Sequence, residues 1–142
     1  MPRWMMLCAG VLMLAAAGAI IPAHRSDQSQ FHAAIRPEIT VIYVGAADCA
    51  PCKSWEQGDG AVFRATSEFS RISYREVKAP STFDLLKDKY WPDELRGYRD
   101  RLPGDAGVPL WFVIADHDVV EQRFGESQWQ SAVLPALKAL LR

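Results

Sequence analysis

The sequence predicts an α/β fold, in which short strands alternate with helical segments. Runs rich in β-branched and aromatic residues, the pattern of strands, recur at four places: 39–44, 72–77, 110–115 and 119–124. Segments with apolar residues at helical spacing follow the first run, from Ala50, and the last run, from Ser127. The chain has 142 residues, near the usual size of one domain, and an apolar fraction of 49% that can form a core.

The first 23 residues are predicted to direct export. Met1-Pro2-Arg3 precedes an uncharged run from Trp4 to Ala23. One positive charge, an apolar stretch and small residues near its end are typical of a secretory signal peptide, with cleavage after Ala19 or Ala23. The run of about 20 residues is also long enough to span a bilayer. A retained inner-membrane anchor through residues 4–23 is therefore the alternative, and both interpretations place the rest of the chain in the periplasm.

Residues 24–37 are polar and weakly patterned, and they are predicted to be a linker to a single domain at 38–142. The formal net charge is −1, so no basic surface supports binding of nucleic acid.

The first predicted strand leads through small residues into Cys49-Ala50-Pro51-Cys52. Pro51 suits the first turn of a helix, where a missing N–H costs nothing. Cys49 is therefore expected near the N-terminus of a helix that begins at Ala50. Free N–H groups and the positive end of the helix dipole stabilise a thiolate there. Cys52 lies one turn further on, close enough to close a small disulfide ring.

The cysteine count favours a redox role for this pair. Cys8, the third cysteine, lies in the leader and is interpreted as a small apolar residue. A disulfide between Cys49 and Cys52 would restrain the unfolded chain little, because the loop is so short. Structural zinc normally takes four ligands, and the sequence has no second C-x-x-C and no H-x₃₋₅-H motif. No metal and no cofactor are predicted.

The helix from Ala50 is predicted to be interrupted at Gly58-Asp59-Gly60, by a kink or a short loop, and to resume over 61–69. The strand at 72–77 follows, with alternate residues from Ile72 onwards on one face of the sheet.

The section 81–107 carries helix signals of its own. Ser81-Thr-Phe-Asp84 resembles a capping box that opens a helix to about Tyr90. Trp91-Pro92-Asp93 breaks this helix. A second short helix is predicted over 94–101, followed by a loop.

The last helix is predicted to start at Ser127, which forms a capping box with Gln130. Pro135 is expected to kink it, because the carbonyl of Ser131 loses its partner. An apolar stripe at helical spacing is expected to face the core: Trp129, Val133, Leu137 and Leu140.

Together these motifs resemble the thioredoxin family. The strand, C-x-x-C and helix are similar to its active-site segment. Gly107-Val108-Pro109, the two following strands, Gly125 and the last helix are similar, in this order, to its C-terminal half. The resemblance covers about 39–142 except for the middle section. It implies a thioredoxin-like three-layer fold, in which helices flank a central mixed β-sheet. Thioredoxins usually have one helix in the middle section, so 81–107 is interpreted as an inserted helical section before the cis-proline.

The resemblance implies a role for each motif residue. Cys49 is the attacking thiolate and Cys52 the resolving thiol, and the two alternate between dithiol and disulfide. Pro109 is the cis-proline that packs against this disulfide. It leaves the backbone N–H and C=O of Val108 free to pair with an extended partner segment. The inserted section either shapes the choice of partner or is a surface elaboration without a role.

Two family features are missing. Asp48 replaces the tryptophan that often precedes the first cysteine, and Tyr43 replaces a buried aspartate in the preceding strand. Glu56, one turn beyond Cys52, is the candidate substitute for the proton relay that this aspartate serves. The alternative is a solvated acid on the helix surface. Trp55 and Trp111 are interpreted as packing residues.

These features predict an exported, monomeric thiol–disulfide oxidoreductase that reduces cysteine-containing proteins and receives electrons from an upstream thiol donor. The reducing direction rests on Pro51, because family oxidases and isomerases carry histidine there, and on Asp48, whose charge disfavours the Cys49 thiolate. Two alternatives stay open. One is a thiol oxidase or isomerase. The other is a non-catalytic thioredoxin-like module that binds partners or holds Cu(I) between two thiolates.

Overall fold

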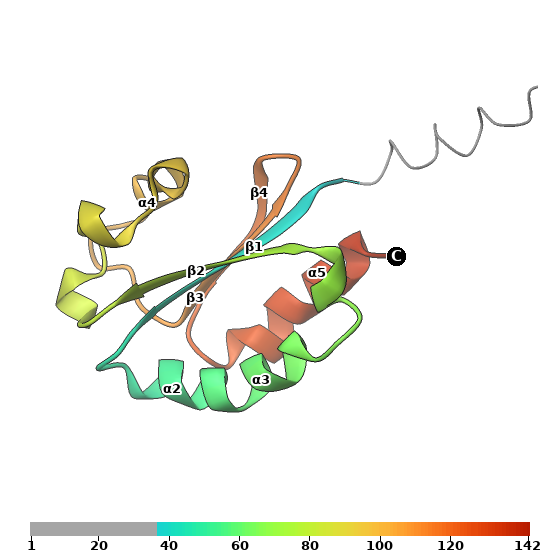
Figure 1. Cartoon of the computed structure of the whole chain (residues 1–142), viewed down its shortest axis with the longest axis horizontal. Helices are drawn as coiled ribbons and strands as arrows, with labels where there is room; N and C mark the ends of the chain where they lie inside the picture. Colours follow the sequence, from blue (N-terminus) through green and yellow to red (C-terminus); the bar gives the residue numbers. More distant parts are fainter. Residues whose placement is uncertain (1–36) are drawn as a thin grey trace, which may run out of the picture. The chain divides into compact units, whose positions relative to one another are not determined.

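Four strands form one mixed sheet in the order β2-β1-β3-β4 (Figure 1). The computed structural model describes residues 37–142, so the predicted leader and nearly all of the predicted linker lie outside the described residues. β1 and β2 are parallel, and β3 is antiparallel to both of its neighbours. All four predicted strands are confirmed: β1 (Ile39–Ala46), β2 (Ser73–Ala79), β3 (Leu110–Ala115) and β4 (Asp118–Phe124). In the described part of the chain, no helix has the length and apolar character that a membrane crossing requires.

β1 lies between two other strands, and its side chains are buried from Val41 to Ala46. This burial on both faces explains why its sequence is an uninterrupted apolar run rather than an alternating one. Val41 and Tyr43 point into one hydrophobic cluster, whereas Ile42 and Val44 point into a second cluster on the opposite face. The sheet thus separates two cores, as the predicted three-layer arrangement requires.

Helices cover one face of the sheet: α2 (Ala50–Gln57), α3 (Asp59–Arg64) and α5 (Leu134–Leu140) (Figure 1). Aromatic rings fill the space between these helices and the sheet. Trp55 of α2 is central, because its ring centroid lies 4.4 Å from that of Tyr43, 5.3 Å from Trp111 and 5.1 Å from Trp129. The helix that carries the cysteines is therefore packed directly on the largest side chains of this core.

The predicted interruption of the first helix is a kink. α2 ends at Gln57. The N–H of the next residue, Gly58, donates to the carbonyl of Ser54 at 2.9 Å, and α3 begins at Asp59. The predicted continuation to residue 69 is wrong, because α3 ends at Arg64. The Thr66 hydroxyl donates to the carbonyl of Phe63 at 2.7 Å and accepts from the N–H of Phe69 at 3.3 Å. These local side-chain bonds compete with the helical ones.

The C-terminal helix begins with a π-helical turn, Trp129–Val133, and continues as α5. The predicted start and capping box at Ser127 are wrong, because no side chain caps this turn and the Ser131 hydroxyl donates to the Ser127 carbonyl at 2.8 Å. Pro135 lies at the second residue of α5, directly after the π-helical turn, and the kink predicted there stays a prediction. The predicted stripe is buried at Trp129, Val133 and Leu137, whereas Leu141 is more deeply buried than Leu140.

A tight hairpin joins β3 and β4 at Asp116 and His117, whose φ angles of 49° and 75° suit a two-residue connection. β4 also contains a bulge. Ile114 pairs with Val119 and Val113 pairs with Glu121, so Val120 has no partner across the hairpin. Beyond the bulge the pairing continues to the last residue of β4.

The section 81–107 forms the third layer, on the face of the sheet opposite α2 (Figure 1). The predicted helix over 81–90 is wrong, because two 3₁₀ turns replace it, Thr82–Asp84 and Asp88–Tyr90. Ser81 caps the first turn by accepting from the N–H of Phe83 at 3.3 Å. The predicted second helix exists as a 3₁₀ turn, Asp93–Leu95, that continues into α4 (Arg96–Arg99). The inserted section is therefore built mainly of 3₁₀ turns.

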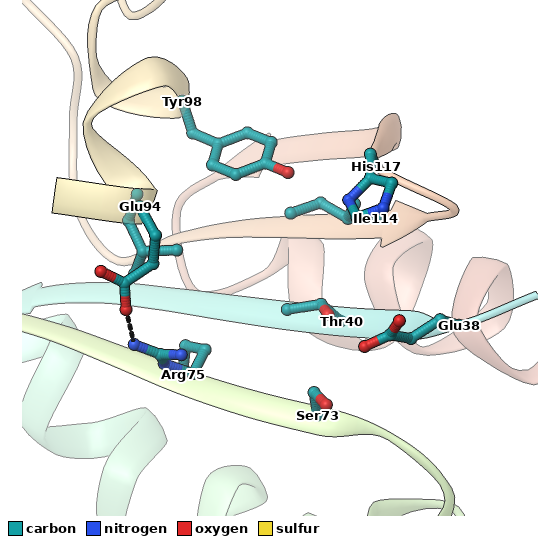
Figure 2. Close-up of a pocket in the computed structure, with 9 residues that line it drawn as sticks. Glu38, Thr40, Ser73, Arg75, Glu94, Tyr98, Ile114 and His117 are labelled. Carbon is teal, nitrogen blue, oxygen red and sulfur yellow. Dashed lines mark hydrogen bonds and ion pairs between the residues drawn. The ribbon is translucent and has the colours of Figure 1, made fainter. Parts of the chain in front are cut away.

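An open cavity of about 240 Å³ lies between this third layer and the sheet (Figure 2). Thr40 and Ser73, near the starts of β1 and β2, line it from the sheet, and Glu94 and Leu95 line it from the third layer. Tyr98 and His117 border it, and an ion pair between Arg75 and Glu94 lies at one side. Because Cys49 follows the opposite end of β1, this cavity is separate from the predicted redox site.

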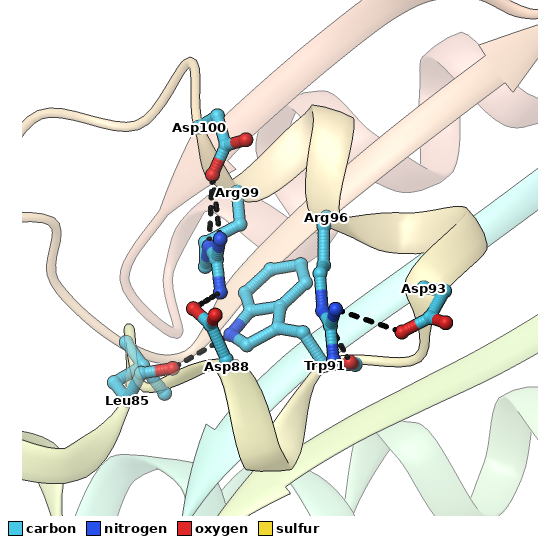
Figure 3. Close-up of polar contacts among 7 residues, drawn as sticks. All are labelled: Leu85, Asp88, Trp91, Asp93, Arg96, Arg99 and Asp100. Atoms are coloured by element: carbon cyan, nitrogen blue, oxygen red, sulfur yellow. Dashed lines mark hydrogen bonds and ion pairs between the residues drawn. The ribbon is translucent and has the colours of Figure 1, made fainter.

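Trp91 fixes the inserted section to the sheet (Figure 3). Its side chain is 2% exposed, and its indole N–H donates to the Leu85 carbonyl at 2.7 Å. In a continuous helix this carbonyl would accept from the backbone N–H four residues on, so the indole stands in for one helical hydrogen bond. Arg96 donates to the Trp91 carbonyl at 3.3 Å, and Arg99 pairs with Asp88 at 2.5 Å. Two arginines from α4 thus hold the turn that carries Trp91.

Candidate redox site

The two cysteines form a disulfide at the N-terminus of α2, with Cα atoms 5.2 Å apart. Cys49 is the N-cap residue, and its Sγ accepts from the backbone N–H of Cys52 at 3.1 Å. Cys49 is 6% exposed and Cys52 is 0% exposed. An approaching sulfur can therefore reach only Cys49. A thiolate released at this position would keep a hydrogen bond and the favourable end of the helix dipole.

The approach to the helix is made from small residues that allow a tight turn. The N–H of Ala47 donates to the Ala79 carbonyl at 2.9 Å, which holds the loop beside the end of β2. The N–H of Cys49 then donates to the Ala46 carbonyl at 3.2 Å. Pro51 lies in the first turn of α2, as predicted.

The loop before β3 lies against the disulfide. The Val108–Pro109 peptide bond is cis, and the Val108 carbonyl oxygen lies 3.7 Å from Cys49 Sγ. Val108 also packs on the small cluster formed by the two cysteines and Ala46. The structure therefore brings together Cys49, Cys52, Val108 and Pro109, although the loop is distant from the cysteines in the sequence.

A turn after β4 connects the two halves of the site. The N–H of Gly125 donates to the Pro109 carbonyl at 2.8 Å, and the next residue, Glu126, accepts from the Ser54 hydroxyl of α2 at 2.5 Å. Gly125 has a φ of 90°, a conformation that favours glycine. Gly125 belongs to the predicted pattern, but Ser54 and Glu126 do not, because a serine and a glutamate so far apart in the sequence carry no signal of their contact.

Asp48 anchors the inserted section to the redox loop. One carboxylate oxygen accepts from the N–H of Thr82 at 2.8 Å, and the other accepts from the Ser81 hydroxyl at 2.9 Å. The hydrogen bond from Ser81, followed by those from Thr82, holds the pKa of Asp48 below its usual value. The sequence predicts Asp48 only as a charge next to Cys49, and this anchoring contact carries no signal in the sequence.

The side chain of Glu56 reaches from α2 to the sheet and is 21% exposed. Its carboxylate accepts from the buried Tyr43 hydroxyl and from Lys78 Nζ, both at 2.8 Å. Burial favours a higher pKa for Glu56, but the hydrogen bonds from Lys78 and Tyr43 outweigh it and the net pKa is lowered. Burial first, and then the bond to Glu56, raise the pKa of Tyr43. Glu56 is thus a bonded, ionised carboxylate rather than a solvated one, and its proton-relay role stays a prediction.

Trp55 and Trp111 pack as predicted, with exposures of 1% and 0%. Their indole N–H groups have no hydrogen-bond partner among the described residues. Within residues 37–142, no group of three or more His, Cys, Asp or Glu side chains is arranged to hold a metal ion.

The structure is similar to those of solved thioredoxins. The thioredoxin pre-protein of Schistosoma mansoni is 15% identical, with a TM-score of 0.47 over 81% of this chain and 90% of that one. Thioredoxin from Malassezia sympodialis is 15% identical, with a TM-score of 0.48 over 78% and 88%. The periplasmic thioredoxin SoxS from Paracoccus pantotrophus is 14% identical, with a TM-score of 0.46 over 72% and 95%. No protein-family model and no curated protein sequence matches this chain.

The chain has a thioredoxin-like fold. Its own sheet order places β1 and β3 side by side, so that the loops which follow one strand and precede the other meet at the same edge. The C-x-x-C disulfide and the loop with Pro109 lie at that edge.

Proposed function

We propose that the chain is an exported thiol–disulfide oxidoreductase that reduces disulfides in partner proteins. The observation that carries the proposal is the Cys49–Cys52 disulfide at the start of α2, in which only Cys49 is accessible and Val108 lies alongside. A buried structural disulfide has no need of an accessible sulfur at a helix N-terminus.

The proposed reaction starts from the dithiol. The Cys49 thiolate attacks one sulfur of a substrate disulfide, and the other substrate sulfur leaves as a thiolate that takes up a proton. Cys52 then loses its proton and attacks Cys49 Sγ, which expels the second substrate thiol. Two electrons and two protons pass to the substrate, and the chain ends as the disulfide. A thiol donor restores the dithiol by the same exchange in reverse.

The partners in this proposal are cysteine-containing proteins, bound through an extended segment. The Val108 backbone lies beside Cys49 Sγ, and the side chain of Val108 is partly exposed. A partner segment that pairs with this backbone would pass its own sulfur across Cys49. Backbone pairing of this kind gives affinity without demanding one particular sequence.

The reducing direction is testable as a redox potential. Proline rather than histidine precedes Cys52, so no imidazolium stabilises the Cys49 thiolate, and Asp48 adds a negative charge nearby. We expect an equilibrium titration against glutathione to give a potential near that of thioredoxin, about −270 mV. A value near that of the strong periplasmic oxidase, about −120 mV, would support the oxidase alternative instead.

Two variants test whether the charge of Asp48 lowers the redox potential. Asp48→Asn keeps an acceptor for Thr82 and a partner for Ser81 but removes the charge, and we expect it to raise the potential. Glu56→Gln removes a carboxylate that Lys78 already compensates, so we expect a smaller rise. Equal potentials in wild type and Asp48→Asn would show that the charge of Asp48 does not set the direction.

Export is proposed from the leader at 1–23. We expect a reporter enzyme that functions only in the periplasm to be active when it is fused after Arg142. Activity confined to a reporter that works only in the cytoplasm would contradict export. The molecular mass of the mature fusion protein distinguishes a cleaved signal from a retained anchor, because cleavage removes about 20 residues.

A further inference from the structure

We infer that Phe83 is a docking contact that selects partner segments with a bulky apolar residue near their reactive disulfide. The inference rests on the proposed function and concerns the same site. It gives the inserted section a role in partner choice.

Phe83 stands out by its exposure. Three large apolar side chains are exposed in the described part of the chain, and Phe83 is the most exposed of them at 94%, against 68% for Val62 and 48% for Val120. Burial of an aromatic ring against a partner is favourable, and aromatic side chains, Phe included, are enriched at the cores of protein interfaces.

The position of Phe83 is tied to the redox loop. Asp48, directly before Cys49, binds the N–H of Thr82 and the hydroxyl of Ser81, and the Ser81 hydroxyl accepts from the N–H of Phe83. Two hydrogen bonds therefore connect this turn to the residue beside the attacking sulfur, and a third, within the turn, holds the backbone of Phe83. The ring is presented on a held turn rather than on a free loop.

The surface beside the disulfide suits an uncharged, extended segment. Ala47, Ala50 and Pro51 are exposed around Cys49, and Val108 is partly exposed on the other side. The nearby carboxylates are engaged within the chain: Asp48 accepts from Ser81 and Thr82, and Glu126 accepts from Ser54. A partner backbone laid along Val108 would meet small apolar groups at the sulfur and Phe83 at the rim. The partner segment that fits this surface is thus an extended one with Leu, Ile or a similar residue a few positions from its cysteine.

Two peptide disulfides test this inference. They are identical except that leucine flanks the cysteine in one and serine in the other. Pre-reduced protein is mixed with each peptide, and the rate of oxidation is followed by acid quenching and mass spectrometry. We expect wild type to prefer the leucine peptide about tenfold, the scale of discrimination that one apolar contact provides. In Phe83→Ala the ratio of the two rates should fall towards one, while the redox potential stays at the wild-type value.

Val62→Ala is the matched control, because it shortens another exposed apolar side chain on α3, and its ratio should equal that of wild type. Asp48→Ala should lower the ratio by releasing the turn, whereas Asp48→Asn should keep it. An unchanged ratio in Phe83→Ala, or no preference in wild type, would overturn the inference. If wild type reacts with neither peptide, the proposed function itself fails, which is a different result from a lost preference.

Discussion

Replacement of Cys52 by serine is expected to leave the chain covalently joined to its substrate. Cys49 still attacks the substrate disulfide, but no second sulfur is present to release the product. Without the Cys52 thiol, only an external thiol can release the substrate, so the adduct persists when none is added. We expect the mixed disulfide to accumulate to nearly one per chain. Mass spectrometry without reductant should show the added mass, and reductant should remove it.

Two further variants test the roles assigned to the two cysteines and to Glu56. Cys49→Ser should form no adduct and reduce substrate at the uncatalysed background rate, because the accessible nucleophile is lost. An adduct on Cys52 in that variant would reverse the assigned roles. Glu56→Gln keeps both cysteines and addresses the proton on Cys52. Slower decay of the mixed disulfide would assign proton transfer to Glu56, and unchanged decay would limit the carboxylate to its bonds with Tyr43 and Lys78.

Trp91→Ala is expected to destabilise the domain by about 3–5 kcal/mol, the usual cost of truncating a buried tryptophan. The change opens a cavity between the inserted section and the sheet and removes the donor to the Leu85 carbonyl. Because domains of this size are stable by only about 5–15 kcal/mol, the loss is a large part of the total. Urea unfolding followed by circular dichroism measures it as a lower midpoint.

Trp91→Phe separates the two contributions. It keeps most of the apolar ring and removes the N–H, so we expect an intermediate loss of about 1–3 kcal/mol for the unpaired carbonyl. Val62→Ala serves as the surface control and should leave the midpoint unchanged within about 0.5 kcal/mol. A midpoint for Trp91→Ala equal to that control would mean that the inserted section does not contribute to the stability of the sheet.

The strands were predictable because each is a local pattern. β1 and β3 are apolar runs buried on both faces, whereas buried and exposed residues alternate at the end of β2, an edge strand. The cysteines and Pro109 were predictable because their spacing and flanking strands resemble one family. These features depend on residues that are neighbours in the sequence, so they can be predicted from it.

The inserted section and the supporting contacts depend on tertiary structure. In place of the helix expected over 81–90, the indole of Trp91 binds the Leu85 carbonyl, a contact that no local propensity expresses. The same holds for Asp48, whose partners lie more than thirty positions away, and for Glu126, which meets Ser54 from the far end of the chain. Side chains that join distant segments carry no periodic signal, so the geometry of the site exceeded what the sequence predicted.

The bulge at Val120 has a consequence for how the chain tolerates insertions and deletions. Gly125 meets Pro109 because the bulge absorbs the one residue by which β4 exceeds β3 over this stretch. Loss of one residue from β4 would remove the bulge and leave that meeting intact. Loss of one residue from β3 has no such reserve, because it would shift Pro109 away from Gly125 and the cysteines and turn alternate side chains to the wrong face. The hairpin is therefore expected to tolerate the loss of one residue only in β4, its outer strand.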